Sequence, residues 1–213
     1  MLDVLPGFLP DFLAALLVNF QVAMVAMLAG LAIGVLLALA RFRHGLATAP
    51  ATGLAAVMRS IPTFVTMFFL VNVLPANFYL GSWQFVMSPR VAVVAALAMY
   101  ASAHVSDNGL EALRQIRSGS PIAAQLFLTS LLRIFFVLVL TSGFGAAIGL
   151  VESVTVTMRA IEALPKSSDK LLLMGLVILI FTVCFQTFYQ VTKRMRDKIN
   201  QSYSPAIRRS GQL

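Results

Sequence analysis

Charged residues are scarce in this chain of 213 residues. Asp, Glu, Lys and Arg make up 11% of it, whereas a soluble domain has roughly 25%. Hydrophobic residues make up 59%. So few charges cannot cover a surface in water, which indicates a protein whose solvent is lipid.

The net charge of +8 would suggest nucleic acid in a soluble protein, but the basic residues stand between and after apolar runs. That placement fits anionic lipid headgroups better, and no nucleic-acid partner is expected.

Cysteine and histidine are also rare. Cys184 is the one cysteine, so no disulfide can form within the chain, and its apolar surroundings predict a small packing residue. His44 and His104 stand far from Cys184 and from each other, so the spacing predicts no metal site. No grouping of Ser, His and Asp suggests an active site, so no enzyme activity is expected.

Two sequence signals are missing altogether. The chain has no Gly-x-x-x-x-Gly-Lys-Ser/Thr phosphate loop, so a process that uses ATP would need another chain to bind it. The first residues lack the positive charge of a signal peptide, and the first apolar run is too long for one. We therefore expect no cleavable signal peptide.

Long apolar runs predict an all-α membrane protein with about five transmembrane helices. The first run, from about residue 12 to 40, carries no charge and is longer than the roughly 20 residues that a bilayer requires. Small residues recur in it at Ala23, Ala26, Gly30 and Gly34, as close helix packing in lipid requires. The expected spans are residues 12–40, 64–74, 91–106, 134–149 and 171–191.

The segments between these spans are expected at the two membrane surfaces. Residues 46–59 and 122–132 are predicted to lie along the inner interface, and residues 74–90, with several aromatics, at the outer one. Residues 145–149, Gly-Ala-Ala-Ile-Gly, predict a small-residue packing face. Arg133 is placed near the inner surface because a charge at mid-membrane costs a few kcal/mol.

The distribution of basic residues predicts the orientation. Of the sixteen Lys and Arg residues, three are expected outside, three are ambiguous and ten are expected inside. These ten are Arg41, Arg43, Arg114, Arg117, Lys193, Arg194, Arg196, Lys198, Arg208 and Arg209. The N-terminus is then outside and the C-terminus in the cytoplasm. We expect one membrane domain over residues 1–201 and a polar, irregular cytoplasmic tail over 202–213.

A short polar segment, residues 111–121, interrupts the apolar runs. Its sequence is Glu-Ala-Leu-Arg-Gln-Ile-Arg-Ser-Gly-Ser-Pro. Glu111, Ala112 and Gln115 have helical spacing, and Gly119 with Pro121 would end the turn. The segment is therefore expected to form a short surface helix. An ordinary connecting loop without a function is the plain alternative.

The order of residues in this segment resembles the Glu-Ala-Ala…Gly loop of membrane subunits of bacterial ATP-binding-cassette (ABC) importers, in particular the polar amino acid permeases. Leu113 stands where the family has its second Ala, Gly119 comes late, and a second register would place residues 122–124 on the motif without its Glu. In that family the loop docks on the cytoplasmic ATPase. The resemblance implies ATPase-coupling residues at Glu111, Ala112, Leu113, Arg114, Ile116, Gly119, Ser120 and Pro121.

Three further stretches resemble the same permeases. Residues 59–63 are similar to an Arg-Gly-Thr-Pro helix start, residues 131–134 to Leu-Arg-Arg-Ile, and residues 152–157 to a segment that dips beside the substrate path. Tyr100 and Val105 resemble a Tyr-x-x-Glu-Ile pattern with one residue more, and His104 stands where the acid is expected.

The resemblance implies a substrate pathway with five residues of this chain: Glu152, Ser153, Thr155, His104 and Tyr100. Two alternatives stay open. Glu152 could be an outward-facing acid at a helix end, and His104 could be a packed or interfacial residue.

The resemblance as a whole implies one permease subunit of an importer in the bacterial inner membrane. Such a subunit carries polar amino acids or similar small solutes. It pairs with a second permease, alike or different, with a cytoplasmic ATPase dimer that holds ATP and Mg, and with a periplasmic solute-binding protein. Two rival interpretations are an ion-coupled secondary carrier that uses Glu152, Arg133 or His104, and a non-transporting accessory subunit.

Overall fold

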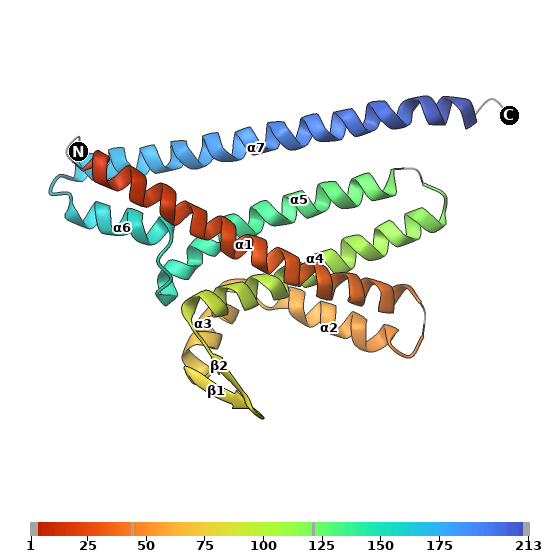
Figure 1. The fold of residues 1–213 in the computed structure, drawn as a ribbon, viewed down its shortest axis with the longest axis horizontal. Coiled ribbons are helices and arrows are strands. Elements are labelled where there is room, and N and C mark those ends of the chain that lie inside the picture. The colour runs from red at the N-terminus through yellow and green to blue at the C-terminus, as the bar shows by residue number, and fades with distance from the viewer. Residues whose placement is uncertain (1–3, 44, 121, 211–213) are drawn as a thin grey trace.

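The computed structural model of the protein describes residues 4–43, 45–120 and 122–210, and it is almost entirely helical (Figure 1). Its elements in chain order are α1 (Leu5–Phe42), α2 (Thr48–Ser60), α3 (Thr63–Val73), β1 (Asn77–Leu80), β2 (Trp83–Val86), α4 (Pro89–Arg117), α5 (Ala123–Ser142), the 3-10 helix η1 (Gly143–Ile148), α6 (Ser153–Ala163) and α7 (Ser167–Ser210). The two strands form an antiparallel hairpin in the segment expected at the outer interface.

Helices α1 and α4 form the centre of the bundle. Helix α1 also contacts α2, α5 and α6, and α4 contacts α2, α3 and α5. Helix α7 lies along the outside against α5 and α6, and the hairpin projects from the end of α3 (Figure 1). The core therefore lies between α1, α4 and α5.

The α1–α4 contact depends on glycine. A Cβ atom on Gly30 would lie 2.4 Å from the Cβ of Ala101, and one on Gly34 would lie 2.6 Å from the Cβ of Val105. The same Gly34 Cβ would approach the carbonyl oxygen of Ser102 to 2.7 Å. The two backbones thus approach more closely than any larger residue permits. This confirms the prediction that the small residues of the first run are a packing face.

Three described helices are long and apolar enough to cross a membrane: Leu5–Phe42, Ala123–Ile148 and Ser167–Arg194. Helices α2 and α3, which meet at a bend of 90°, could together supply a fourth. Helix α4, which contains the expected third span, is not among them. Its apolar half is built largely of buried Ala and Val that face other helices, so it needs less lipid-compatible surface. Five crossings stay a prediction.

Several expected boundaries are wrong. Helix α5 begins at Ala123, so residues 123–132 are the first half of a continuous helix that includes the expected fourth span, and their place along the interface stays a prediction. The turn predicted at residues 111–115 is the end of α4 rather than a helix of its own. Helix α7 continues to Ser210, so residues 202–210 are helical and not irregular, while residues 211–213 lie outside the described residues.

The packing face predicted at residues 145–149 is confirmed at Gly145 only, where an added Cβ would lie 3.1 Å from Cγ2 of Val93 in α4. This segment is the end of η1, and its two glycines have different roles. Gly149 closes the helix with a φ of 90°, a left-handed conformation that favours glycine. Gly145 fits closely against Leu150, whose Cδ2 would lie 2.8 Å from an added Cβ.

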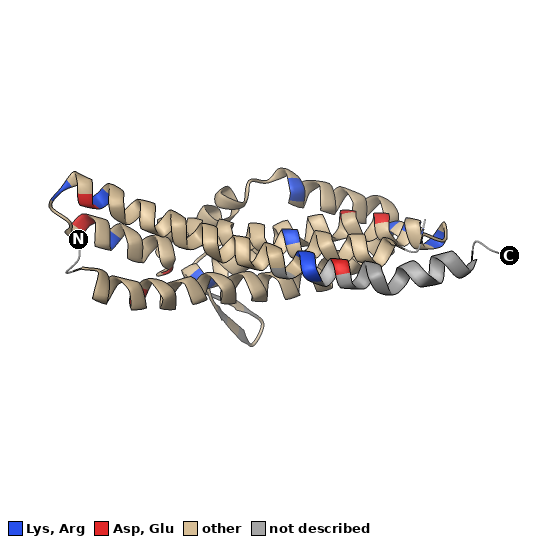
Figure 2. Cartoon of the chain, turned by 90° about the horizontal axis from the view of Figure 1, so that it is seen from above, with Lys and Arg blue, Asp and Glu red and all other residues tan. Residues whose placement is uncertain are grey.

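Charged residues form two groups along the long axis, with a stretch that lacks them between (Figure 2). The α1–α2 loop, the α4–α5 loop and the C-terminal end of α7 lie at one end, opposite the N-terminus and the α6–α7 loop (Figure 1). The basic residues Arg41, Arg114 and Arg117 therefore belong to the same end of the bundle. This is the arrangement that a common cytoplasmic side would require, and the orientation itself stays a prediction.

Gly34→Ala tests the α1–α4 contact. Overpacking at this site should lower stability by roughly 1–3 kcal/mol, measured as a lower midpoint of thermal unfolding in detergent. The control is Gly53→Ala in α2, where an added Cβ meets nothing within 4 Å. There the midpoint should hold or rise, because Ala favours a helix by up to about 1 kcal/mol over Gly. Equal midpoints in the two variants would contradict the packing argument.

Candidate functional site

The polar end of α4 holds the predicted coupling residues. Glu111, Arg114 and Ile116 are exposed, and Ala112 and Leu113 are half-buried. The amide of Gln115 donates a 2.9 Å hydrogen bond to the Glu111 carboxylate, as their helical spacing predicts. The end of α4 thus offers charged and apolar side chains together on one exposed turn.

Helix α4 stops just before Gly119, as the sequence predicted. The φ of Gly119 is 81°, and its N–H donates to the carbonyl of Ile116 at 3.0 Å. The N–H of Ser120 donates to the carbonyl of Gln115 at 2.9 Å, so two of the last carbonyls of α4, those of Gln115 and Ile116, are satisfied. Pro121 lies outside the described residues.

A shallow hollow lies between this end of α4 and the start of α5. Its α4 side is polar and its α5 side is mainly apolar. The lining residues are Asn108, Glu111, Ala112, Gln115, Ala123, Leu126, Phe127 and Ser130. Two of the predicted coupling residues, Glu111 and Ala112, therefore line a concave surface, which is a suitable shape for a protein contact.

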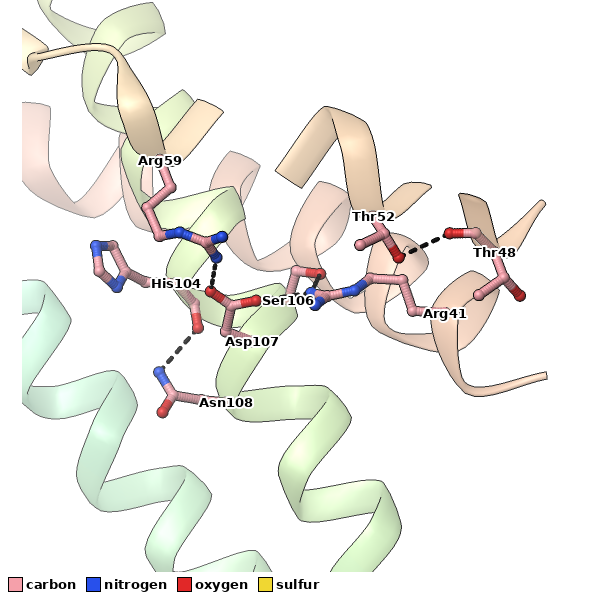
Figure 3. A network of polar contacts seen from close by, with 8 residues as sticks. All are labelled: Arg41, Thr48, Thr52, Arg59, His104, Ser106, Asp107 and Asn108. Atoms are coloured by element: carbon pink, nitrogen blue, oxygen red, sulfur yellow. Dashed lines mark hydrogen bonds and ion pairs between the residues drawn. The ribbon is translucent and has the colours of Figure 1, made fainter. Parts of the chain in front are cut away.

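Asp107 lies one turn before Glu111 on the same helix and joins three helices (Figure 3). Its carboxylate accepts a hydrogen bond at 2.7 Å from Arg41 at the end of α1, and a second from Arg59 at the end of α2. Arg41 also donates to the hydroxyl of Ser106 at 2.9 Å. We call these four residues the arginine junction.

The junction is buried on one side only. The side chain of Arg41 is 12% exposed, that of Asp107 33% and that of Arg59 46%. Asp107 comes after the expected span 91–106. Burial alone would raise its pKa, but hydrogen bonds and charge from Arg41 and Arg59 outweigh burial and lower the pKa below its ordinary value. The carboxyl group therefore stays ionised between its two cations.

Sequence reasoning missed Asp107. The pattern placed His104 where the permeases have an acid, and the acid of this chain comes three residues later. Arg41 was interpreted only as a signal of topology, and Arg59 only as the first residue of a helix start. Two arginines that each end a helix, with a lone Asp in a third, could have indicated an ion pair.

Tyr100 and His104 lie together on α4. Their rings are 4.3 Å apart between centroids, and both side chains are half-buried. The carbonyl of His104 accepts a hydrogen bond of 2.8 Å from the amide of Asn108. Figure 3 shows the His104 ring pointing away from the arginine junction.

Glu152 caps helix α6 from a fully buried position. Its two oxygens accept hydrogen bonds from the N–H groups of Val154 and Thr155, both at 3.0 Å. The hydroxyls of Ser153 and Thr155 lie at 3.2 and 3.3 Å from the same carboxylate. The alternative of an outward-facing acid at a helix end is therefore right about the helix end but wrong about the facing, because Glu152 is fully buried.

Asn19 completes this buried cluster from α1. Its side-chain amide donates to Glu152 at 2.9 Å and to the hydroxyl of Ser142 at 2.8 Å. Its carbonyl oxygen accepts from the N–H of Ser153 at 3.2 Å. Asn19 therefore links α1, α5 and α6. It was not predicted, although a lone Asn in an uncharged run was a possible signal.

The five predicted pathway residues fall into two groups. Tyr100 and His104 are on α4, whereas Glu152, Ser153 and Thr155 surround the start of α6. Among the described side chains, no hydrogen bond joins the two groups. Their role in a pathway stays a prediction.

Asn19→Ala tests the buried cluster. It leaves the carboxylate of Glu152 and the N–H of Ser153 short of a partner, which should cost about 1–3 kcal/mol. The control is Asn72→Ala, because Asn72 is exposed and donates only to the Phe68 carbonyl in its own helix. That variant should stay within about 0.5 kcal/mol of the unaltered protein in thermal unfolding. A similar loss in both variants would contradict a structural role for the cluster.

No protein-family model and no curated protein matches the sequence. A solved structure, described as the crystal structure of an amino acid ABC transporter with histidines, does match. The TM-score is 0.71 at 17% sequence identity, over 90% of this chain and 96% of that chain. At this identity the likeness concerns the fold: the chain has the fold of a chain of an amino acid ABC transporter, along nearly its whole length.

Proposed function

We propose that the protein is a permease subunit of an ATP-driven importer for polar amino acids or similar small solutes. The observation that carries the proposal is the exposed polar end of α4, at the place where the sequence resembles the ATPase-docking loop. The fold shared with a chain of an amino acid ABC transporter supports it. The chain has no phosphate loop, so ATP and Mg belong to a separate ATPase dimer.

The proposed orientation has the N-terminus outside and the C-terminus in the cytoplasm of the bacterial inner membrane. In this orientation the α4–α5 loop and the basic ends of α1 and α7 face the ATPase and the anionic lipid of the inner leaflet. A periplasmic binding protein delivers solute at the opposite end. A second permease, alike or different, completes the pathway, and the exposed apolar surfaces of α1, α3 and α7 are available to it and to lipid.

Transport would proceed by alternating access. Closure of the ATPase pair displaces the docked end of α4, and the helices packed on α4 rock with it. The proposed solutes are polar amino acids in general. A preference for cationic ones would need a free carboxylate in the pathway, and the oxygens of Glu152 are already occupied by hydrogen bonds within the chain.

Co-purification tests the assembly. The tagged protein should recover, in mild detergent, a cytoplasmic ATPase that carries a phosphate loop, identified by mass spectrometry. Recovery of a second, different permease would show a heteromeric pair. A chain that purifies alone, or only with itself, would overturn the importer proposal and favour a secondary carrier or an accessory subunit.

Glu111→Lys tests the coupling site. The reversed charge should abolish solute uptake and recovery of the ATPase, while the amount of protein in the membrane stays unchanged. The control is Glu162→Lys, the same reversal on an exposed residue of α6 toward the other end of the bundle. It should leave ATPase recovery unchanged. Full uptake in the Glu111→Lys variant would contradict the coupling role of this turn.

A further inference from the structure

The arginine junction lies between the proposed coupling turn and the rest of the bundle. Asp107 precedes Glu111 by four residues on an uninterrupted helix, so the two side chains are separated by about one turn, or roughly 6 Å of rise. A displacement of the turn at 111–117 therefore reaches Asp107 directly. What moves next depends on the two contacts that Asp107 makes.

The first contact joins Asp107 to Arg41, and so it lies between α1 and α4, two helices that are rigidly packed on each other. Helices α1 and α4 are already locked by the close approaches at Gly30 and Gly34. Farther along, a Cβ on Gly109 would lie 3.2 Å from the Cβ of Ala38. Helices α1 and α4 would therefore move together even without the Arg41–Asp107 ion pair.

The second contact, to Arg59, holds a helix that packs on α1 and α4 through small side chains. In α2, Ala51 and Ala55 are the buried residues, and both are small. Small buried side chains contribute little apolar area, so packing alone stabilises the position of α2 weakly. Arg59 is in the last turn of α2, and its ion pair with Asp107 ties that end to α4.

The chain bends at Ile61 and Pro62, immediately after the Arg59–Asp107 ion pair, which we call the tether. Ile61 is extended, with φ −85° and ψ 122°, as the residue before a proline usually is, and Pro62 precedes the first turn of α3. Helices α2 and α3 meet there at 90°. Helix α3 packs on α4 and η1. A movement of Arg59 is therefore passed through the bend into α3.

We propose that Asp107 is a positioning residue that fastens the α2–α3 bend to α4 through Arg59. Movement of the coupling turn then carries α3 with the α1–α4 pair. Without the Asp107–Arg59 ion pair, α2 and the α2–α3 bend lag behind α4, although α3 still packs on α4. The mechanical role rests on the proposed function of residues 111–117, whereas the tether itself does not.

Spin-label distance measurements test the tether on the purified chain. Cys184→Ser removes the one native cysteine. One label pair joins Leu54 on α2 to Ile116 on α4, and a reference pair joins Leu36 on α1 to Ile116; all three side chains are exposed. Arg59→Gln removes the cation but leaves Arg41 on Asp107, and Arg59→Lys keeps the charge as the matched control.

The distance distribution of the α2–α4 pair should broaden in Arg59→Gln more than in Arg59→Lys. The α1–α4 pair should stay narrow in both. Asp107→Asn should reproduce the broadening of Arg59→Gln. An α2–α4 distribution in Arg59→Gln that is no broader than in Arg59→Lys overturns the proposal, whatever the transport activity is.

A transport readout tests the mechanical role where the ATPase partner is recovered. Solute imported per ATP hydrolysed should fall roughly fivefold or more in Arg59→Gln, and Arg59→Lys should restore most of it. An unchanged ratio overturns the mechanical role. Failure to recover any ATPase counts against the proposed function alone, since the spin-label result stands without it.

Discussion

Close contact between α1 and α4 is the constraint on which the rest of the bundle depends. In lipid, the hydrophobic effect does not drive two helices together, so their association depends on packing and on polar contacts. Glycines at positions 30 and 34 bring the two backbones close enough for many such contacts. Large apolar side chains are accordingly left on the outer faces, where lipid or a second subunit can cover them. The distribution of Gly and Leu along α1 thus decides which face is internal.

Polar residues then fix how these helices sit along their axes. Asn19 and Arg41 are 22 residues apart on α1, which is about 33 Å along a helix. That length is close to the hydrocarbon thickness of a bilayer, roughly 30 Å. Asn19 holds the start of α6 and Arg41 holds Asp107 of α4. Polar pairs of this kind need not add stability. A shift of one helix along its axis would, however, leave a buried polar group without its partner.

The sequence was sufficient for local features and insufficient for long-range ones. Composition, the small residues of α1 and the stop at Gly119 each follow from a property of a few neighbouring residues. Arg133 led to a wrong start for α5, because a charge was taken as the membrane boundary although the helix continues for ten residues before it. Asp107 and Asn19 were missed for a different reason: their partners lie more than 40 residues away, and no local spacing indicates such a pair.

Helix α4 combines two demands that usually conflict. Its first half packs tightly, which Ala and Val permit, and its last turn is polar and exposed, as the proposed contact with a partner would require. A break in α4 between its two halves would satisfy each demand separately. A force on one half would then bend the helix at the break instead of moving the other half. An uninterrupted backbone from Pro89 to Arg117 avoids this, because hydrogen bonds along the helix resist bending. The break in the chain occurs instead at Pro62, beyond Arg59, so a bend there alters the position of α3 without weakening α4.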